Sequence, residues 1–217
     1  MTLLYSRRRS GVLVPWYRAG GAPQPVAAYQ PKGAASLAAS YVNLANPGTY
    51  NAAPGVAPTW ATGVGWTFDG VTQYLVTGVV PASGYSMLVQ YTGATFESGD
   101  TLCGEFVANA AFLIQYVTAG TNKFRYYSGG SLDGSAFATA GNIGIAGQTA
   151  YLNGVAEAGS IPAWSAATIY DIYIGAVNNA GTGAPGVIAA SVVALAIYST
   201  TLTGPQVAAV ASAMASL

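Results

Sequence analysis

Apolar and polar side chains alternate with a period of two along most of the chain from about residue 25 onward. In one such run, Phe124 and Tyr126 flank the polar Arg125, which predicts a strand with one dry face and one wet face. Gly, Pro, Ser and Asn separate the runs, at a spacing typical of a β-sandwich. The predicted strands lie within 25–31, 65–70, 73–80, 85–93, 111–118, 123–129, 150–159, 167–177 and 187–198.

Two of these runs predict more than a strand. Asn153–Gly154 separates two short apolar runs, and Asn-Gly is the preferred pair for a type I′ hairpin turn because both residues tolerate positive φ. The run "GVIAASVVALAIY" (186–198) is apolar throughout and rich in β-branched residues. It is too short for a membrane-spanning helix, which needs about 20 residues, so it predicts a strand buried on both faces. No membrane association is expected.

The pattern changes to a helical period at the C-terminal end. Thr203 lies three residues before Gln206, which forms a capping box, and Pro205 is tolerated in the first turn. Apolar residues then recur at helical spacing at Val207, Val210, Ala211, Met214 and Leu217. A helix of about 12 residues is marginal alone, so we expect it to pack on the sandwich.

Residues 1–24 do not follow the strand pattern. The segment "SRRRS" is followed by a short apolar stretch with Gly and Pro punctuation, which predicts an extended N-terminal arm before a domain formed by 25–217. The arm is interpreted as a docking segment for a partner protein or as a solvated tail. Three arginines would neutralise only about three phosphates, so no nucleic-acid partner is expected. The candidate docking residues are Arg7, Arg8, Arg9, Trp16 and Tyr17.

The charge content is low for a protein of this size. Asp, Glu, Lys and Arg together make up 6% of the 217 residues, with seven acidic and seven basic side chains. An average soluble domain contains about 25% charged residues. A monomer with so few charges and a net charge of zero is prone to self-association. One interpretation is a surface covered by copies of the same chain or by other subunits, and the alternative is a surface rich in Ser, Thr, Asn and Gly.

The sequence offers little material for catalysis. It contains no histidine, which removes the usual general base and the Ser-His and Cys-His nucleophile pairs. Its single cysteine, Cys103, lies in a strand-like run and is expected to be a small buried residue. No two of the seven acids are two positions apart on one strand, so the sequence predicts that the protein is not an enzyme, and no cofactor or metal site is predicted. The acids are Asp69, Glu97, Asp100, Glu105, Asp133, Glu157 and Asp171.

Two binding chemistries remain open. Glu97 and Asp100 in one loop, with Asn178 and Asn179 in another, could supply oxygen ligands to calcium, although two ordinary polar loops are the favoured explanation. A sugar site needs an aromatic surface and hydrogen-bonding groups, and the chain has 15 Tyr, 6 Phe and 4 Trp. Aromatic side chains in a sandwich also serve as core, so the sequence does not select among them.

Several short motifs occur together in a fixed order. They are Phe68-Asp69-Gly70, Tyr151-x-Asn153-Gly154, Ile174-Gly175 and the ending "IYSTTLTGPQV". Over about 26–217 the chain thereby resembles the laminin G/concanavalin A-like jelly rolls, in particular those of tailed-bacteriophage virion proteins. The resemblance implies an all-β, two-sheet antiparallel jelly-roll sandwich with a short C-terminal helix.

The resemblance also implies a function. We expect a non-enzymatic structural protein of a bacteriophage virion, made as a soluble protein in the host cytoplasm and used in head decoration or in the tail. Its partners would be other virion proteins and copies of itself. The alternative is a lectin-like, carbohydrate-binding module that recognises cell-surface glycans.

Overall fold

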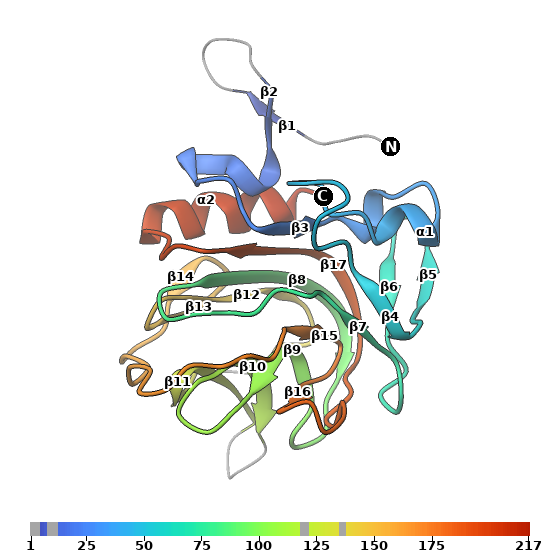
Figure 1. Ribbon diagram of the computed structural model, residues 1–217. Helices are drawn as coiled ribbons and strands as arrows, with labels where there is room; N and C mark the ends of the chain where they lie inside the picture. Colours follow the sequence, from blue (N-terminus) through green and yellow to red (C-terminus); the bar gives the residue numbers. More distant parts are fainter. Residues whose placement is uncertain (1–4, 8–12, 118–121, 135–137) are drawn as a thin grey trace.

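The structure is a computed structural model that describes residues 5–7, 13–117, 122–134 and 138–217. Two β-sheets pack face to face and helix α2 (Gly204–Ala215) covers one of them, as Figure 1 shows. The pairs within both sheets are antiparallel except for that between β16 and β9. The predicted two-sheet antiparallel sandwich with a short C-terminal helix is therefore confirmed.

The two sheets contain seven and eight strands. The seven-stranded sheet has the order β11 (Lys123–Asp133), β10 (Ala111–Val117), β9 (Thr101–Phe106), β15 (Tyr173–Ile174), β7 (Tyr74–Val76) and β4 (Ala53–Val56), with β16 (Asn178–Asn179) beside β9. The eight-stranded sheet has the order β14 (Val155–Ala156), β13 (Thr149–Leu152), β12 (Gly141–Ala146), β8 (Ser86–Thr95), β17 (Ala189–Tyr198), β6 (Gly65–Thr67) and β5 (Thr59–Ala61), with β3 (Ala27–Tyr29) beside β17.

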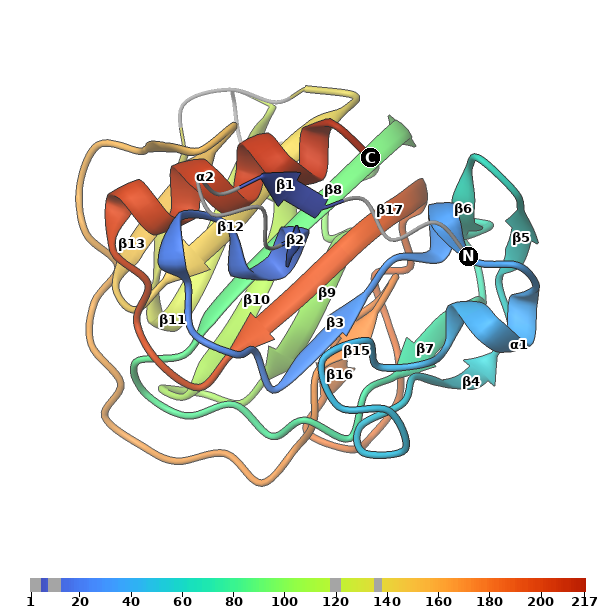
Figure 2. The same cartoon turned by 90° about the horizontal axis from the view of Figure 1, so that it is seen from above.

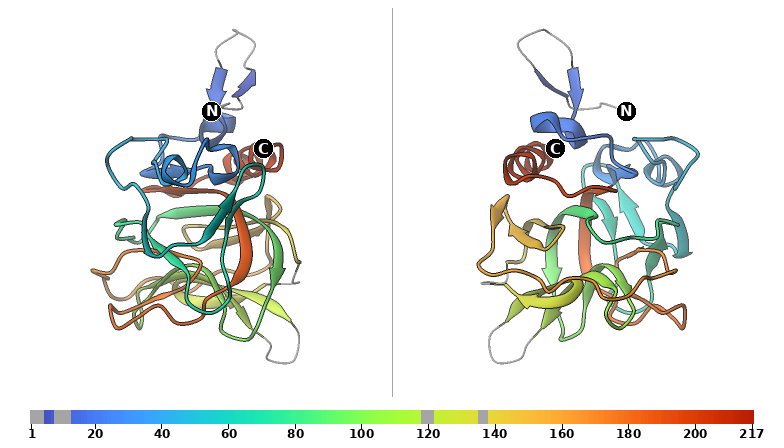
Figure 3. Two further views of the ribbon diagram at one scale, coloured as in Figure 1. Left: turned by 90° about the vertical axis from the view of Figure 1, so that its right-hand side faces the viewer. Right: turned by 60° about the vertical axis from the view of Figure 1, so that its left-hand side comes forward.

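The remaining elements lie near the N-terminus. β1 (Tyr5–Arg7) and β2 (Leu13–Pro15) form a separate antiparallel pair that projects beyond the body of the sandwich (Figure 3). A 3-10 helix, η1 (Trp16–Gly21), follows this pair, and two short helices, η2 (Pro31–Gly33) and α1 (Leu37–Ser40), come before β4.

The main core fills the space between the sheets. Trp66, Met87 and Leu195 enter it from the eight-stranded sheet, and Leu75 and Phe112 enter it from the seven-stranded sheet. Cys103 also lies in this core, as the sequence predicts, and burial raises the pKa of its thiol. Each large apolar side chain removed from water contributes roughly 1.5–3 kcal/mol, so the inward-facing positions of the alternating runs stabilise the sandwich.

Strand β17 is buried on both faces. Its Leu195 and Ile197 side chains contribute to the main core, whereas Ala194, Ala196 and Tyr198 belong to a second apolar cluster on the opposite face. This agrees with the sequence pattern, in which the run shows no alternation. A second layer must therefore cover the eight-stranded sheet.

Helix α2 supplies much of that layer. The Gln206 side chain accepts the Thr203 backbone N–H at 2.9 Å, which satisfies an otherwise unpaired donor at the start of the helix. Val207, Val210 and Met214 are buried against the sheet. Figure 2 shows α2 and η1 side by side over the same face. The predicted capped helix and its apolar stripe are confirmed.

The Asn-Gly hairpin is also present. Asn153 and Gly154 connect β13 to β14, with φ of 51° and 78°. Both values are positive, as a type I′ turn requires.

One predicted strand is mostly absent. Of 167–177, only Tyr173–Ile174 forms a strand, and Ile169 is 80% exposed. The Thr168 hydroxyl accepts the Tyr170 N–H at 3.1 Å, a local side-chain bond that competes with strand pairing. The alternation of residues in this segment was therefore a misleading signal.

The N-terminal segment packs on the sandwich from Trp16 onward. Trp16 is 1% exposed and Tyr17 is 6% exposed, and both belong to the cluster beneath α2. The Tyr198 hydroxyl donates to the Tyr17 carbonyl oxygen at 2.7 Å, and the Tyr17 hydroxyl donates to the Leu44 carbonyl oxygen at 3.1 Å. The division at residue 24 stays a prediction, but close packing with the domain already begins at Trp16.

Within the described residues, no helix has both the length and the apolar character needed to span a membrane.

We expect Trp16→Ala to lower the free energy of unfolding by about 3–5 kcal/mol, because it leaves a cavity between η1 and α2. Urea denaturation measures this change. Arg18→Ala, at an exposed position in the same helix, is the control and should change the free energy by no more than about 0.5 kcal/mol. Equal stabilities of the two variants would show that η1 does not contribute to the packing of the domain.

Candidate functional site

The outer face of the seven-stranded sheet carries a small apolar cluster of its own. On β10, Phe112 and Ile114 point into the main core, so Leu113 between them points to the other side of the sheet. Leu113 forms a separate buried cluster there with Ala111 and Val177. This face is turned away from the eight-stranded sheet, toward the bottom of Figure 1.

Strand register places aromatic side chains on both sides of this cluster. Tyr173 pairs with Gly104, Gly104 pairs with Leu113, and Leu113 pairs with Tyr127. These four residues form one row across the outer face, with strands about 4.8 Å apart. Gly104 has a φ of 144°, and a Cβ there would collide with Leu113, so only glycine fits at this position. The row therefore has no side chain between Tyr173 and Leu113.

A pocket lies at the Tyr127 end of this row, and we name it the Tyr127 pocket. Its volume is about 280 Å³, close to the lower end of small-molecule sites at roughly 300–1,000 Å³. The rings of Phe106 and Tyr127 meet edge to face, with centroids 6.0 Å apart, and Phe106 is 39% exposed. The lining residues are Phe106, Leu113, Gln115, Tyr127, Val177, Asn179 and Pro185.

Two side-chain amides add polar groups to this apolar surface. The Gln115 Nε2 group donates to the Gly99 carbonyl oxygen at 3.1 Å, which fixes this side chain at the pocket. The backbone of Asn179 is held by Gly183 and Thr182, at 3.2 and 2.9 Å. Among the residues that the structure describes, the Asn179 side-chain amide has no hydrogen-bond partner. It can therefore donate to and accept from a ligand.

An ion pair borders the pocket. Arg125 is paired with Gln115 across the strands, and its guanidinium binds Asp133 through two bonds of 2.5 and 3.0 Å. The hydrogen bond from Arg125 lowers the pKa of the Asp133 carboxyl, and the same bond, with a further one to Tyr127, raises the pKa of Arg125. The charges of the two side chains cancel at the rim.

The same face carries a second aromatic surface. The rings of Tyr74 and Tyr173 stack with centroids 5.0 Å apart and planes 26° apart. The Tyr74 ring lies directly on Gly55 of β4, where any side chain would displace it. The outer face thus presents stacked rings at one end of the row and the Tyr127 pocket at the other.

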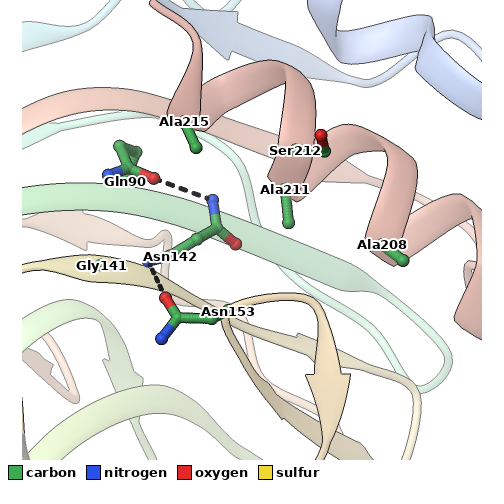
Figure 4. Close-up of a pocket in the computed structure, with 8 residues that line it drawn as sticks. All are labelled: Gln90, Gly141, Asn142, Asn153, Ala208, Ala211, Ser212 and Ala215. Carbon is green, nitrogen blue, oxygen red and sulfur yellow. Dashed lines mark hydrogen bonds between the residues drawn. The ribbon is translucent and has the colours of Figure 1, made fainter.

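A second cavity lies beneath helix α2, on the eight-stranded sheet. Its volume is about 200 Å³, and Ala208, Ala211, Ser212 and Ala215 of the helix form one wall. Figure 4 shows Gln90, Asn142 and Asn153 on the other side. The Asn142 amide nitrogen donates to the Met214 sulfur at 2.9 Å and lies 3.5 Å from the Gln90 oxygen. No aromatic ring lines this cavity, so it fits a sugar less well than the Tyr127 pocket does.

Glu105 is a buried acid, but it does not belong to the Tyr127 pocket. It pairs with Phe112, so its side chain points to the core side of the sheet, and it is 0% exposed. The Thr168 hydroxyl donates to Glu105 Oε2 at 3.0 Å, and Oε1 has no partner among the described residues. Burial raises the pKa of this carboxyl to about 8, despite the lowering effect of its bonds with Thr168 and Phe112.

The other acids that the sequence offers have local roles. The Asp69 carboxylate accepts backbone N–H groups of Val71, Thr72 and Gln73, which closes the turn after β6. Burial acts to raise the pKa of Asp69, but these bonds outweigh it and lower the pKa to about 2. The Asp100 carboxylate accepts the Glu97 N–H at 2.7 Å. In the described part of the chain, no group of three or more His, Cys, Asp or Glu residues lies close enough together to hold a metal ion. The calcium site considered from the sequence, which combines two acids with two asparagines, stays untested.

The structure places only some of the candidate docking residues of the N-terminal segment. Trp16 and Tyr17 pack inside the chain's own apolar cluster, so a partner could contact their rings only if they left this packing. The Arg7 backbone pairs with Leu13, while Arg8 and Arg9 lie outside the described residues. Docking through this segment stays a prediction.

Comparisons with known proteins were made by sequence and by structure. Neither a protein-family model nor a curated protein sequence matches the chain. By structure, the chain is similar to Trypanosoma rangeli sialidase in complex with sialic acid, with a TM-score of 0.61 and 14% identity, over 97% of this chain and 36% of that chain. The same sialidase as a covalent intermediate with 2,3-difluorosialic acid gives a TM-score of 0.64 at 14% identity, over 95% and 35%.

A further similar structure is a domain of comparable size. It is domain 4 of AbnA, a GH43 extracellular arabinanase from Geobacillus stearothermophilus, in complex with arabinotriose. The TM-score is 0.55 and the identity is 17%, over 87% of this chain and 98% of that chain. The chain thus spans about a third of the sialidase chains and nearly all of the arabinanase domain. At these identities the likeness shows the fold alone.

These similarities correct one prediction. The sequence predicts that the protein is not an enzyme, yet the fold recurs within chains of sialidases, which are enzymes. The prediction is wrong at the level of the fold. The chain lacks histidine and closely spaced acids, yet it adopts a fold that is also present in glycoside hydrolases. The jelly-roll part of the resemblance agrees with the structure, whereas none of the comparisons links the chain to a virion.

We expect the stability of the protein to fall as the pH rises from about 5 to about 8, because of Glu105. Its pKa of about 8 in the folded state lies above the ordinary value of 4.5, so the protonated carboxyl stabilises the fold fully below about pH 4.5. That stabilisation is lost as the pH rises through the folded pKa. Urea denaturation of Glu105→Gln across this range should show a smaller fall than the wild type.

Glu97→Gln is the control, because it removes the same charge from an exposed position. It should keep the pH dependence of the wild type. If Glu105→Gln also kept that dependence, the carboxyl would not titrate from a buried, neutral state.

Proposed function

We propose that the protein is a carbohydrate-binding domain and that the Tyr127 pocket is its binding site. The observation that carries the proposal is the meeting of two aromatic rings and two side-chain amides in one pocket of about 280 Å³. The C–H face of a sugar packs on aromatic rings, and its hydroxyls pair with amide groups that both donate and accept.

The similar structures support this proposal at the level of the fold. The arabinanase domain that the chain covers almost entirely was solved in complex with arabinotriose, and the sialidase was solved in complex with sialic acid. The Tyr74–Tyr173 stack lies on the same face as the Tyr127 pocket. A longer glycan could therefore contact both aromatic surfaces.

The expected place of this domain is a separate prediction. A virion location, with other virion proteins and copies of the chain as partners, rests on the sequence resemblance and on the low charge content. A domain on a particle surface could also bind host glycans, so the two expectations are compatible. Light scattering of the purified protein tests self-association, and a monomer at high concentration would contradict it.

We expect Tyr127→Ala to weaken glycan binding at least tenfold, which corresponds to about 1.4 kcal/mol, because it removes the main ring of the pocket. Tyr127→Phe keeps the ring and should retain most of the affinity. A glycan array identifies a ligand, and isothermal titration calorimetry with that ligand or with arabinotriose measures the affinities.

Val155→Ala is the matched control, since Val155 is an exposed apolar residue on the other sheet. It should bind like the wild type. The proposal fails if the array and arabinotriose give no binding, or if Tyr127→Ala binds as tightly as the control.

A further inference from the structure

The lining of the Tyr127 pocket carries no formal charge. Its seven residues, all in the described part of the chain, include no Asp, Glu, Lys or Arg. Its polar groups are the amides of Gln115 and Asn179 and the phenol of Tyr127. These groups hydrogen-bond a hydroxyl well but supply no counter-charge to an acid.

Arg125 is a cation that borders this lining, and it is already engaged. It lies opposite Gln115 on the neighbouring strand and two positions before Tyr127 on its own strand. Two of its five N–H donors bind Asp133 in a bidentate pair. An incoming carboxylate would compete with Asp133 for these donors and would lie near its negative charge.

An acidic sugar would therefore lose more free energy from the dehydration of its carboxylate than it gains from contacts in the pocket. Moving a carboxylate from water to an apolar site is costly unless a cation and hydrogen bonds replace the lost water. A neutral sugar has no such requirement, and its hydroxyls find the Asn179 amide free among the described residues.

We propose that the Tyr127 pocket selects uncharged sugar residues and rejects uronic and sialic acids, and that the Arg125–Asp133 pair enforces this choice. The inference rests on the proposed carbohydrate-binding function. The Asn179 amide is the specificity group for the sugar hydroxyls.

The experiment compares neutral sugars with acidic counterparts that carry a carboxylate. The probes are methyl galactoside against methyl galacturonide, methyl glucoside against methyl glucuronide, and lactose against sialyllactose, with arabinotriose as a further neutral probe. Calorimetry or NMR titration of the wild-type protein should show at least tenfold tighter binding of a neutral sugar than of its acidic counterpart. The neutral affinity should change little with salt, because no ion pair forms with the ligand.

Asp133→Asn tests the role of the ion pair directly. It frees Arg125 beside the pocket, so the affinity for the acidic partner of the best neutral sugar should rise at least tenfold and should weaken with salt. The matched control is the double variant Arg125→Gln/Asp133→Asn, which removes both charges and should reject the acid as the wild type does. Both side chains are partly exposed, and urea denaturation checks that the variants remain folded.

The outcomes separate the inference from the function on which it rests. Equal binding of acidic and neutral sugars by the wild type, with loss of both in Tyr127→Ala, would overturn the selectivity and leave the proposed function in place. An Asp133→Asn variant that gains no affinity for the acid would also overturn the inference. If none of the neutral or acidic probes bound, the proposed function itself would be wrong.

Discussion

The structure depends on burying one face of the seven-stranded sheet while leaving the other face at the surface. Successive residues of a strand point to opposite sides, so β10 sends Phe112 and Ile114 into the core and Leu113 outward. The same rule buries Phe124 and Tyr126 on β11 and leaves Tyr127 outside. The alternation that stabilises the sandwich therefore also places the ring on which the candidate site is built, and a register shift of one residue would destroy both.

The eight-stranded sheet, unlike the seven-stranded one, needs a cover on its outer face. Strand β17 is apolar on both faces, so its outer side requires a cover, which α2 and the segment beginning at Trp16 provide. That cover packs the rings of Trp16 and Tyr17 and the aliphatic side chains of α2 on this face, and it leaves a cavity lined by Ala and amide groups. In the described part of the chain, no comparable helix lies over the aromatic outer surface of the seven-stranded sheet (Figure 1). The difference between the covered face and the exposed aromatic face follows from where the apolar runs lie.

Local patterns predicted the local structure well. The Asn153–Gly154 turn, the helix that begins after Thr203, and the doubly buried β17 each depend on neighbouring residues, and each is present. The site was not predictable in this way, because its row joins Tyr173, Gly104, Leu113 and Tyr127 through pairings between strands distant in sequence. The positive φ of Gly104 and the Asn179 amide, which has no hydrogen-bond partner among the described residues, likewise become visible only in three dimensions. The prediction about enzymatic activity was overturned by the similarity of fold to parts of sialidase chains, which no residue pattern along the sequence reveals.

The pocket offers a second explanation for the low charge content of the chain. A surface with few ions favours self-association, which is how the sequence alone was interpreted. A face that recognises neutral sugars through rings and amides has the same composition, because a strong field would attract charged polymers without specificity. The Arg125–Asp133 pair fits this reasoning: the cation that borders the pocket is paired with an acid, so the rim keeps hydrogen-bond donors without a net charge. Neutrality is therefore a property of the site itself as well as of the whole chain.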